Sequence, residues 1–253
     1  MIKKDVIITV FANSTQAPCN KWAQEFFSEE PIVLTVPGGG GNDFRAKAIN
    51  WTRSGDTFAA ALKELRPDLK DVEVGRRGLV TFSAGWAFAD ELLKSATEKD
   101  RLDAYLLLDG CHTNVLAQWI SFASRAANLD AFMVMAHSCI KPPFISTTIT
   151  NSEIFRRAAA SNSADMAKPE VESDIPDYVL NAVITDPITI SLGASPGLPG
   201  VSKKWPKDVL MNSENRGGLT RLQYSGNDRP DHVYIAWYVA KRLWKWLGEE
   251  WSE

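Results

Sequence analysis

Short apolar runs alternate along the chain with segments in which apolar residues recur every three or four positions. Apolar runs of about five residues, bounded by polar or turn-forming residues, are typical of strands buried on both faces of a sheet. The region 182–192 is interrupted by Pro187 and predicts only a short strand. The uninterrupted runs predict strands at Val6–Phe11, Ile32–Val36, Gly78–Phe82, Ala104–Leu108, Ala131–Met135 and Leu219–Tyr224.

The segments with helical spacing lie between these runs. Strands and helices that alternate in this way predict an α/β fold, a mostly parallel central sheet with helices on both faces, in a single domain over residues 1–253. Two irregular segments, at about 161–177 and 193–218, are expected to shape a binding cleft. The expected helices are Thr57–Leu65, Trp86–Thr97, Val115–Ala127, Asn151–Ala160 and a last one over about 233–247.

Composition narrows the class of protein. With 45% hydrophobic and 23% charged residues, the 253-residue chain is typical of a soluble globular protein, and its net charge of −3 argues against a nucleic-acid partner. The N-terminal apolar run is too short for a signal peptide, and no run reaches membrane-spanning length, so we expect a cytoplasmic protein without a membrane span. The three cysteines lack metal-type spacing, and we predict neither a metal nor a cofactor.

A serine flanked by small residues stands where a predicted strand passes into a predicted helix. In the segment Thr81-Phe82-Ser83-Ala84-Gly85, Ser83 follows the strand directly and the helix begins at Trp86. Ligands of such sheets bind at the carboxyl ends of the strands, so this corner would present a hydroxyl group there. The alternative is a tight turn for which any small residues would suffice.

This segment resembles the nucleophile elbow of the α/β-hydrolase superfamily, Gly-x-Ser-x-Gly between a strand and a helix. Gly85 matches the second glycine, and Thr81 replaces the first. The resemblance implies a serine hydrolase with Ser83 as nucleophile, followed along the chain by an acid and then a histidine. His232 lies after the last predicted strand and just before the last helix, which is where the superfamily places its base. The alternative for His232 is a packing residue at a helix start.

The acid is predicted at Asp109. The superfamily most often places it after the second strand beyond the nucleophile, but the residues there, Met135 to Phe144, contain no carboxylate. Asp109 ends the strand immediately after the nucleophile, where some members of the superfamily carry the acid. The alternative is an Asp-Gly turn residue. Asp228, Asp231 and Glu153 are the remaining candidates.

A glycine run after the second predicted strand is the candidate oxyanion loop. It resembles the HGGG-type loop of the superfamily, with Pro37 where the histidine often stands. The resemblance implies that backbone N–H groups in this run, together with that of Ala84, hold the oxyanion. The alternatives are a flexible turn or a phosphate loop, although no Gly-Lys-Ser/Thr follows. The residues assigned to the run are Gly38, Gly39 and Gly40.

Three further residues are expected to line the cleft: Trp86, just after the corner, His137, after a predicted strand, and Trp205, in an irregular segment. The resemblance as a whole implies a serine hydrolase that cleaves a carboxylic ester, small or lipid-like, through a Ser-His-Asp triad and an acyl-enzyme intermediate. The same groups would serve an amidase or peptidase. A non-catalytic binding protein of the same fold is the alternative from another class.

Overall fold

The computed structural model describes residues 2–12, 18–69, 71–110, 117–138, 145–161, 189–191, 202–204, 210–224 and 235–252. Its centre is a seven-stranded sheet in the order β2-β1-β3-β4-β5-β9-β8. Every neighbouring pair is parallel except β8 with β9, which confirms a mostly parallel α/β architecture. The strands are β1 Lys3–Phe11, β2 Ile32–Thr35, β3 Glu73–Phe82, β4 Ala104–Leu108, β5 Phe132–Ser138, β8 Leu210–Arg216 and β9 Leu219–Tyr224.

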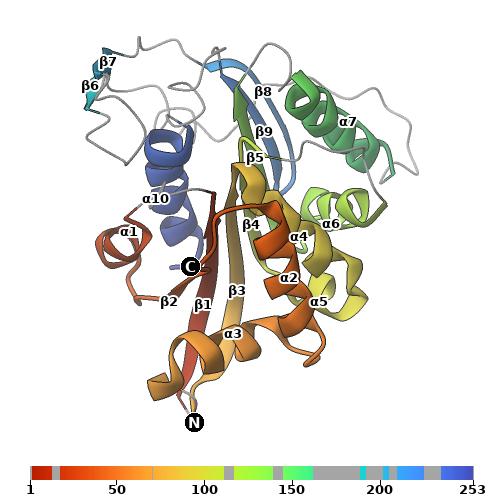
Figure 1. Cartoon of the computed structure of the whole chain (residues 1–253). Coiled ribbons are helices and arrows are strands. Elements are labelled where there is room, and N and C mark those ends of the chain that lie inside the picture. Colours follow the sequence, from red (N-terminus) through yellow and green to blue (C-terminus); the bar gives the residue numbers. More distant parts are fainter. Residues whose placement is uncertain are drawn as a thin grey trace.

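Helices cover both faces of this sheet (Figure 1). On one face lie α1 and α10, with the π-helical turn Ile235–Val239 before α10. On the other face α2, α3, α4, α6 and α7 pack against the sheet, and α5 follows α4. The bounds are α1 Cys19–Phe26, α2 Gly41–Thr52, α3 Thr57–Leu65, α4 Trp86–Lys94, α5 Ala96–Arg101, α6 Ala117–Ala127, α7 Ile145–Ser161 and α10 Ala240–Glu250.

Each central strand contributes side chains to two separate cores. In β4 all five residues are buried; Tyr105 and Leu107 join the core beneath α6, and Leu106 and Leu108 join the core beneath α10. Burial on both faces requires an uninterrupted apolar strand, and this is why β4 was predicted to the residue.

Three predicted helices differ in the structure. The helix expected over 86–97 is divided, because Ser95 is extended (φ −78°, ψ 117°) and accepts a hydrogen bond from the N–H of Glu98, which caps α5. The helix expected from Asn151 begins earlier, at Ile145. The last helix is preceded by a π-helical turn from Ile235.

Part of the segment expected to be irregular, 193–218, forms strands. Its residues Leu210–Arg216 are β8, the antiparallel edge of the main sheet, and Ser202–Lys204 are β7, which pairs with β6 (Thr189–Ser191). An edge strand buries little surface, so the polar sequence LMNSENR carries no apolar signal. Of the other expected segment, 161–177, the structure describes only Ser161.

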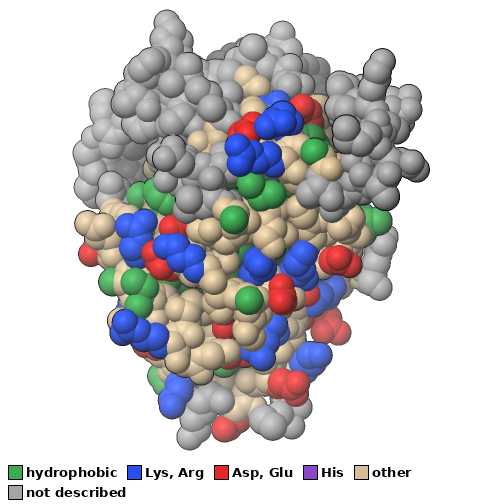
Figure 2. Space-filling view, turned by 90° about the vertical axis from the view of Figure 1, so that its right-hand side faces the viewer, with side chains coloured by type: hydrophobic (Ala, Val, Ile, Leu, Met, Phe, Trp, Pro, Cys, Tyr) green, Lys and Arg blue, Asp and Glu red, His purple; other side chains and the backbone are tan. Residues whose placement is uncertain are grey.

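The described surface has mixed charge. On the face shown in Figure 2, Lys and Arg side chains alternate with Asp and Glu side chains. No helix within the described ranges is long and apolar enough to cross a lipid bilayer.

Candidate functional site

The strand-to-helix corner is formed by Ser83–Gly85, a single 3-10 turn between β3 and α4. Ser83 has a φ of 53°, in the left-handed region that residues other than glycine seldom occupy. Such a conformation typically costs about 1–3 kcal/mol and persists only where the surroundings enforce it. The serine is half-buried, so the corner holds it in strain at the carboxyl edge of the sheet.

Two neighbouring strands enforce this conformation. A Cβ atom on Gly85 would lie 2.1 Å from the carbonyl oxygen of Val10 in β1, so only glycine fits there. On the other side, a Cβ atom on Gly110, just after β4, would lie 3.0 Å from the carbonyl oxygen of Ser83. The corner is therefore confined between the ends of β1 and β4.

Thr81, which replaces the first glycine of the resembled motif, has a local explanation. Its side chain is fully buried, and its hydroxyl lies 2.8 Å from the hydroxyl of Tyr105 on β4. The neighbouring strand thus supplies a hydrogen bond at a position where the resembled motif has no side chain.

Asp109 is the second strained residue at this edge. It follows β4, is 1% exposed and has a φ of 41°. Its N–H donates to the carbonyl oxygen of Ala136 in β5 at 2.7 Å. The remaining described non-glycine residue with positive φ, Leu129, follows the end of α6 and is exposed, which is ordinary just after a helix C-terminus. The strain at the sheet thus falls on the predicted nucleophile and the predicted acid.

The glycine run lies beside the corner. It joins β2 to α2, and a Cβ atom on Gly41 would lie 3.8 Å from the carbonyl oxygen of Ala84. Gly38 has a φ of 150°, and the N–H of Gly39 donates to Asp43 Oδ2 at 3.4 Å. The Gly39 N–H is therefore directed to the first turn of α2 instead of being free for an oxyanion.

In the sheet, β1 is the direct neighbour of β3, so the end of β1 lies next to the corner, whereas the glycine run follows the more distant strand β2. Phe11 pairs with Phe82, so Ala12 follows β1 beside Ser83, whereas β2 lies one strand further out. The sequence analysis did not include Ala12, because an apolar pattern does not report which strands are neighbours. The turn-forming residues after the first predicted strand, Asn13 and Ser14, were the available signal.

The predicted cleft residues have different surroundings. Trp86 begins α4 half-buried, with the Arg45 guanidinium 6.0 Å from its ring centroid. His137, in β5, is completely buried and lies within hydrogen-bonding distance of Arg221 on β9. His232 and Trp205 lie outside the described residues, as do His112, Asp228 and Asp231.

Glu153, another alternative acid, has its own partners. Hydrogen bonds from Arg156 and Arg157 on α7 lower its pKa to about 2. These contacts lie on the exposed side of α7, so Glu153 is explained as a surface ion-pair residue.

Asn151 is a polar residue whose burial the sequence did not predict. It is completely buried on α7, near the apolar Ile154 and Phe155 that face the sheet, and neither polar atom of its amide has a hydrogen-bond partner among the described residues. Only the packing of α7 on β5 and β9 reveals it, because asparagine at a helix start is otherwise read as a cap.

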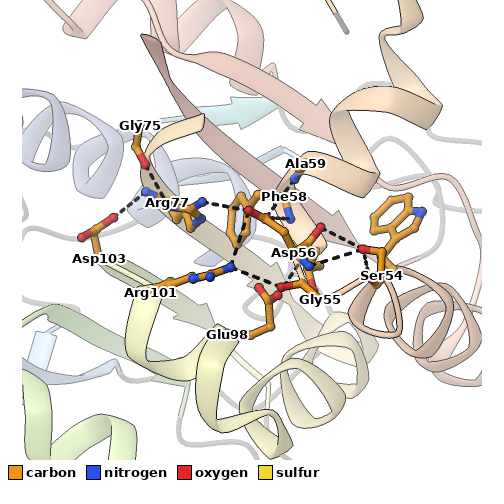
Figure 3. Close-up of polar contacts among 12 residues, drawn as sticks. Ser54, Gly55, Asp56, Phe58, Ala59, Gly75, Arg77, Glu98, Arg101 and Asp103 are labelled. Atoms are coloured by element: carbon orange, nitrogen blue, oxygen red, sulfur yellow. Dashed lines mark hydrogen bonds and ion pairs between the residues drawn. The ribbon is translucent and has the colours of Figure 1, made fainter. Parts of the chain in front are cut away.

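The opposite ends of β3 and β4 carry a polar network (Figure 3). Asp56 caps α3 by accepting hydrogen bonds from the N–H groups of Phe58 and Ala59, at 3.1 and 3.0 Å. Its other carboxylate oxygen lies 3.0 Å from Arg77 Nη2 and 3.7 Å from Arg101 Nη1. The residues of this network stabilise one another.

Two carboxyl groups, one buried and one half-buried, complete the network. Glu98, 1% exposed, accepts a hydrogen bond from the N–H of Thr57 at 2.9 Å, and Asp103 accepts one from the N–H of Arg77 at 2.6 Å. Burial raises the pKa of both carboxyl groups. The network joins α3, β3 and α5 at the end of the sheet away from Ser83.

A groove that the structure describes lies away from the corner. It has a volume of about 740 Å³, follows the outer edge of β2 and is lined by Asn20, Ile32, Leu65 and Leu69 among others, but by none of the predicted site residues. Within the described ranges, no three His, Cys, Asp or Glu residues are placed to hold a metal ion. No family model and no curated protein matches the sequence of this chain.

Proposed function

We propose that this chain is a serine hydrolase of the α/β-hydrolase type, with Ser83 as the nucleophile. The observation that carries the proposal is the φ of 53° at Ser83, at a strand-to-helix corner where Gly85 leaves no space for a side chain. A nucleophilic serine held on such a corner exposes its Oγ above the sheet. Strain of this kind is retained where a function requires the geometry.

The proposed reaction is the hydrolysis of a carboxylic ester. Ser83 Oγ attacks the ester carbonyl while His232 accepts the serine proton, and His232 then delivers that proton to the departing alcohol. Asp109 orients His232 and stabilises the imidazolium. The N–H of Ala84, at the start of a helix, and the backbone N–H groups of Gly38 and Gly40 hold the oxyanion. A water molecule that gives its proton to His232 then cleaves the acyl-enzyme and releases the acid.

Two observations support Asp109 as the acid. It shares unusual backbone strain with Ser83, and the residue after it, Gly110, abuts the backbone of Ser83. The expected substrate is a small or lipid-like ester, with Trp86 beside the corner as a contact for its apolar part.

Labelling with a fluorophosphonate tests the nucleophile. Wild type should become labelled and should hydrolyse p-nitrophenyl esters, and Ser83→Ala should do neither. Ser28→Ala is the matched control, because Ser28 is exposed and pairs only with Ser252 in the described structure, so this variant should be labelled like wild type. If the folded wild type is neither labelled nor active, the result overturns the proposed hydrolase and favours a non-catalytic binding protein of the same fold.

The acid and the base are tested by steady-state kinetics on the same ester. Asp109→Asn should lower kcat by up to about ten-thousand-fold, because it favours the wrong imidazole tautomer. His232→Ala should lower kcat by several orders of magnitude while the protein stays folded. Near-wild-type turnover of Asp109→Asn would move the acid to Asp228 or Asp231.

A further inference from the structure

A largely buried polar cluster links β9 to its two neighbouring strands, β5 and β8. Arg221 on β9 is 4% exposed; its Nη1 lies 3.2 Å from His137 Nε2 and 3.1 Å from Gln223 Oε1, and its Nε donates to Glu214. The strand register pairs His137 with Gln223 and Glu214 with Arg221. One guanidinium therefore links side chains from three adjacent strands.

The contact with Arg221 determines the protonation state of His137. A guanidinium is always charged and can only donate hydrogen bonds, so His137 Nε2 must accept. The ring is then neutral, with its proton on Nδ1. A second proton would set N–H against N–H at 3.2 Å and bury a second positive charge beside the first.

Few charged groups near His137 would favour the protonated form of its ring. Glu214 is already paired with Arg221, and Asp109 follows the neighbouring strand β4. The buried side chains described on α6 and α7, which pack over β5 and β9, are uncharged. The group described within hydrogen-bonding distance of Nε2 is the cation of Arg221.

We infer that His137 is a positioning residue: neutral and protonated at Nδ1, it accepts a hydrogen bond from Arg221 and so fixes β9 to the carboxyl end of β5. The positioning role rests on the proposed function, since β9 leads in sequence to His232, but the protonation state does not. His137 is then not the base, and of the three histidines only His112 and His232 remain for that role.

Nitrogen-15 NMR of the histidine rings in the full chain, from pH 5 to pH 8, tests the protonation state. Loss of one ring signal in His137→Gln assigns the residue. We expect the pattern of a neutral ring with its proton on Nδ1 at every pH. An imidazolium pattern near pH 5, or a proton on Nε2, overturns the inference. If His137→Gln does not fold, His112→Gln and His232→Gln assign the other two ring signals, and the remaining wild-type signal is that of His137.

Variants test the link to Arg221. In Arg221→Met the His137 ring should become an imidazolium in mildly acidic solution, whereas Arg156→Gln, which changes an exposed arginine of α7, should leave it neutral. His137→Leu should speed amide hydrogen exchange at the end of β9 by about tenfold, as expected for losing one hydrogen bond to a charged group. His137→Gln keeps an acceptor and should restore slow exchange. Equal exchange in the two His137 variants overturns the positioning role.

Kinetics separate this inference from the proposed function. If wild type hydrolyses esters, His137→Leu should lower kcat with little change in KM and should leave the acidic limb of the pH–rate profile in place. Disappearance of that limb would make His137 the base and overturn the inference. If wild type is inactive and unlabelled, the proposed function fails, while the NMR and exchange results still decide the role of His137.

Discussion

The two ends of β3 and β4 are built in opposite ways. At the amino ends, Asp56, Arg77 and Asp103 hydrogen-bond to one another or to nearby backbone N–H groups. At the carboxyl ends, Ser83 and Asp109 hold positive φ angles, and neighbouring backbone confines the residues that follow them. One end lowers the free energy of the fold by pairing and capping, and the other retains strain. Backbone strain lowers stability and is retained where a function requires the geometry. This contrast therefore supports the proposal that the carboxyl end carries the function.

The largest expected effect comes from filling the space beside the corner. Gly85→Ala would place a Cβ atom 2.1 Å from the carbonyl oxygen of Val10, so β1 and the corner must move apart. We expect a loss of about 3 kcal/mol in the free energy of unfolding, measured by urea denaturation. Gly40→Ala is the control, because nothing lies within 4 Å of its Cβ position and its backbone is extended. Equal stability of the two variants would show that the corner is not confined.

At the amino end, removal of the cap should have a smaller effect. Asp56→Ala removes the acceptor for two N–H groups of α3 and the partner of Arg77. The expected loss is about 1–2 kcal/mol, measured in the same way. Asp56→Asn keeps a capping oxygen and should lose less. If both variants unfold like wild type, the network adds little to the amino end.

Replacing Ser83 by glycine separates the effect of backbone strain from the effect of losing the hydroxyl group. Ser83→Ala and Ser83→Gly both remove the hydroxyl, but only glycine occupies a φ of 53° without strain. We therefore expect Ser83→Gly to be more stable than Ser83→Ala by about 1 kcal/mol, measured by thermal and urea unfolding. A glycine variant no more stable than the alanine variant would mean that the corner is not strained.

The smallest effect is on pH dependence at the amino end. Burial raises the pKa of Glu98 above 4.5, so its contribution to stability is fully present below that pH and is lost as pH rises through the folded-state pKa. Glu98→Gln cannot ionise, so its melting temperature should rise relative to wild type as pH increases from about 4.5 to 8.

Glu64→Gln is the control of opposite sign. Hydrogen bonds from Lys47 and Trp51 lower the pKa of Glu64, so its contribution is present above pH 4.5 and is lost as pH falls through the folded-state pKa. Its melting temperature should therefore fall relative to wild type as pH increases toward about 4.5, and should stay level with respect to wild type above that pH. Parallel pH trends in the two variants would contradict the assigned environments.

The sequence alone determined the elements whose burial is repetitive. Helix Thr57–Leu65 and strands Ala104–Leu108 and Leu219–Tyr224 have the predicted bounds. In each of them the residues that pack against the core recur at regular positions along the chain, so the sequence pattern alone predicts the element. It also placed Ser83 directly after a strand and Asp109 after the next one, since strand ends follow from where the apolar runs stop. The polar edge strand β8 and helix α2 carry too weak a pattern to be predicted in this way.

Only the tertiary structure decided the backbone strain and the hydrogen-bond partners at those positions. The strain at Ser83 depends on Val10 and Gly110, which come from two other strands, and the tolerance of threonine at position 81 depends on Tyr105. The protonation state inferred for His137 depends on Arg221, 84 residues away in the chain. The physical reason is that an apolar pattern records how much surface a residue buries, whereas strain, hydrogen-bond partners and charge depend on which strands become neighbours.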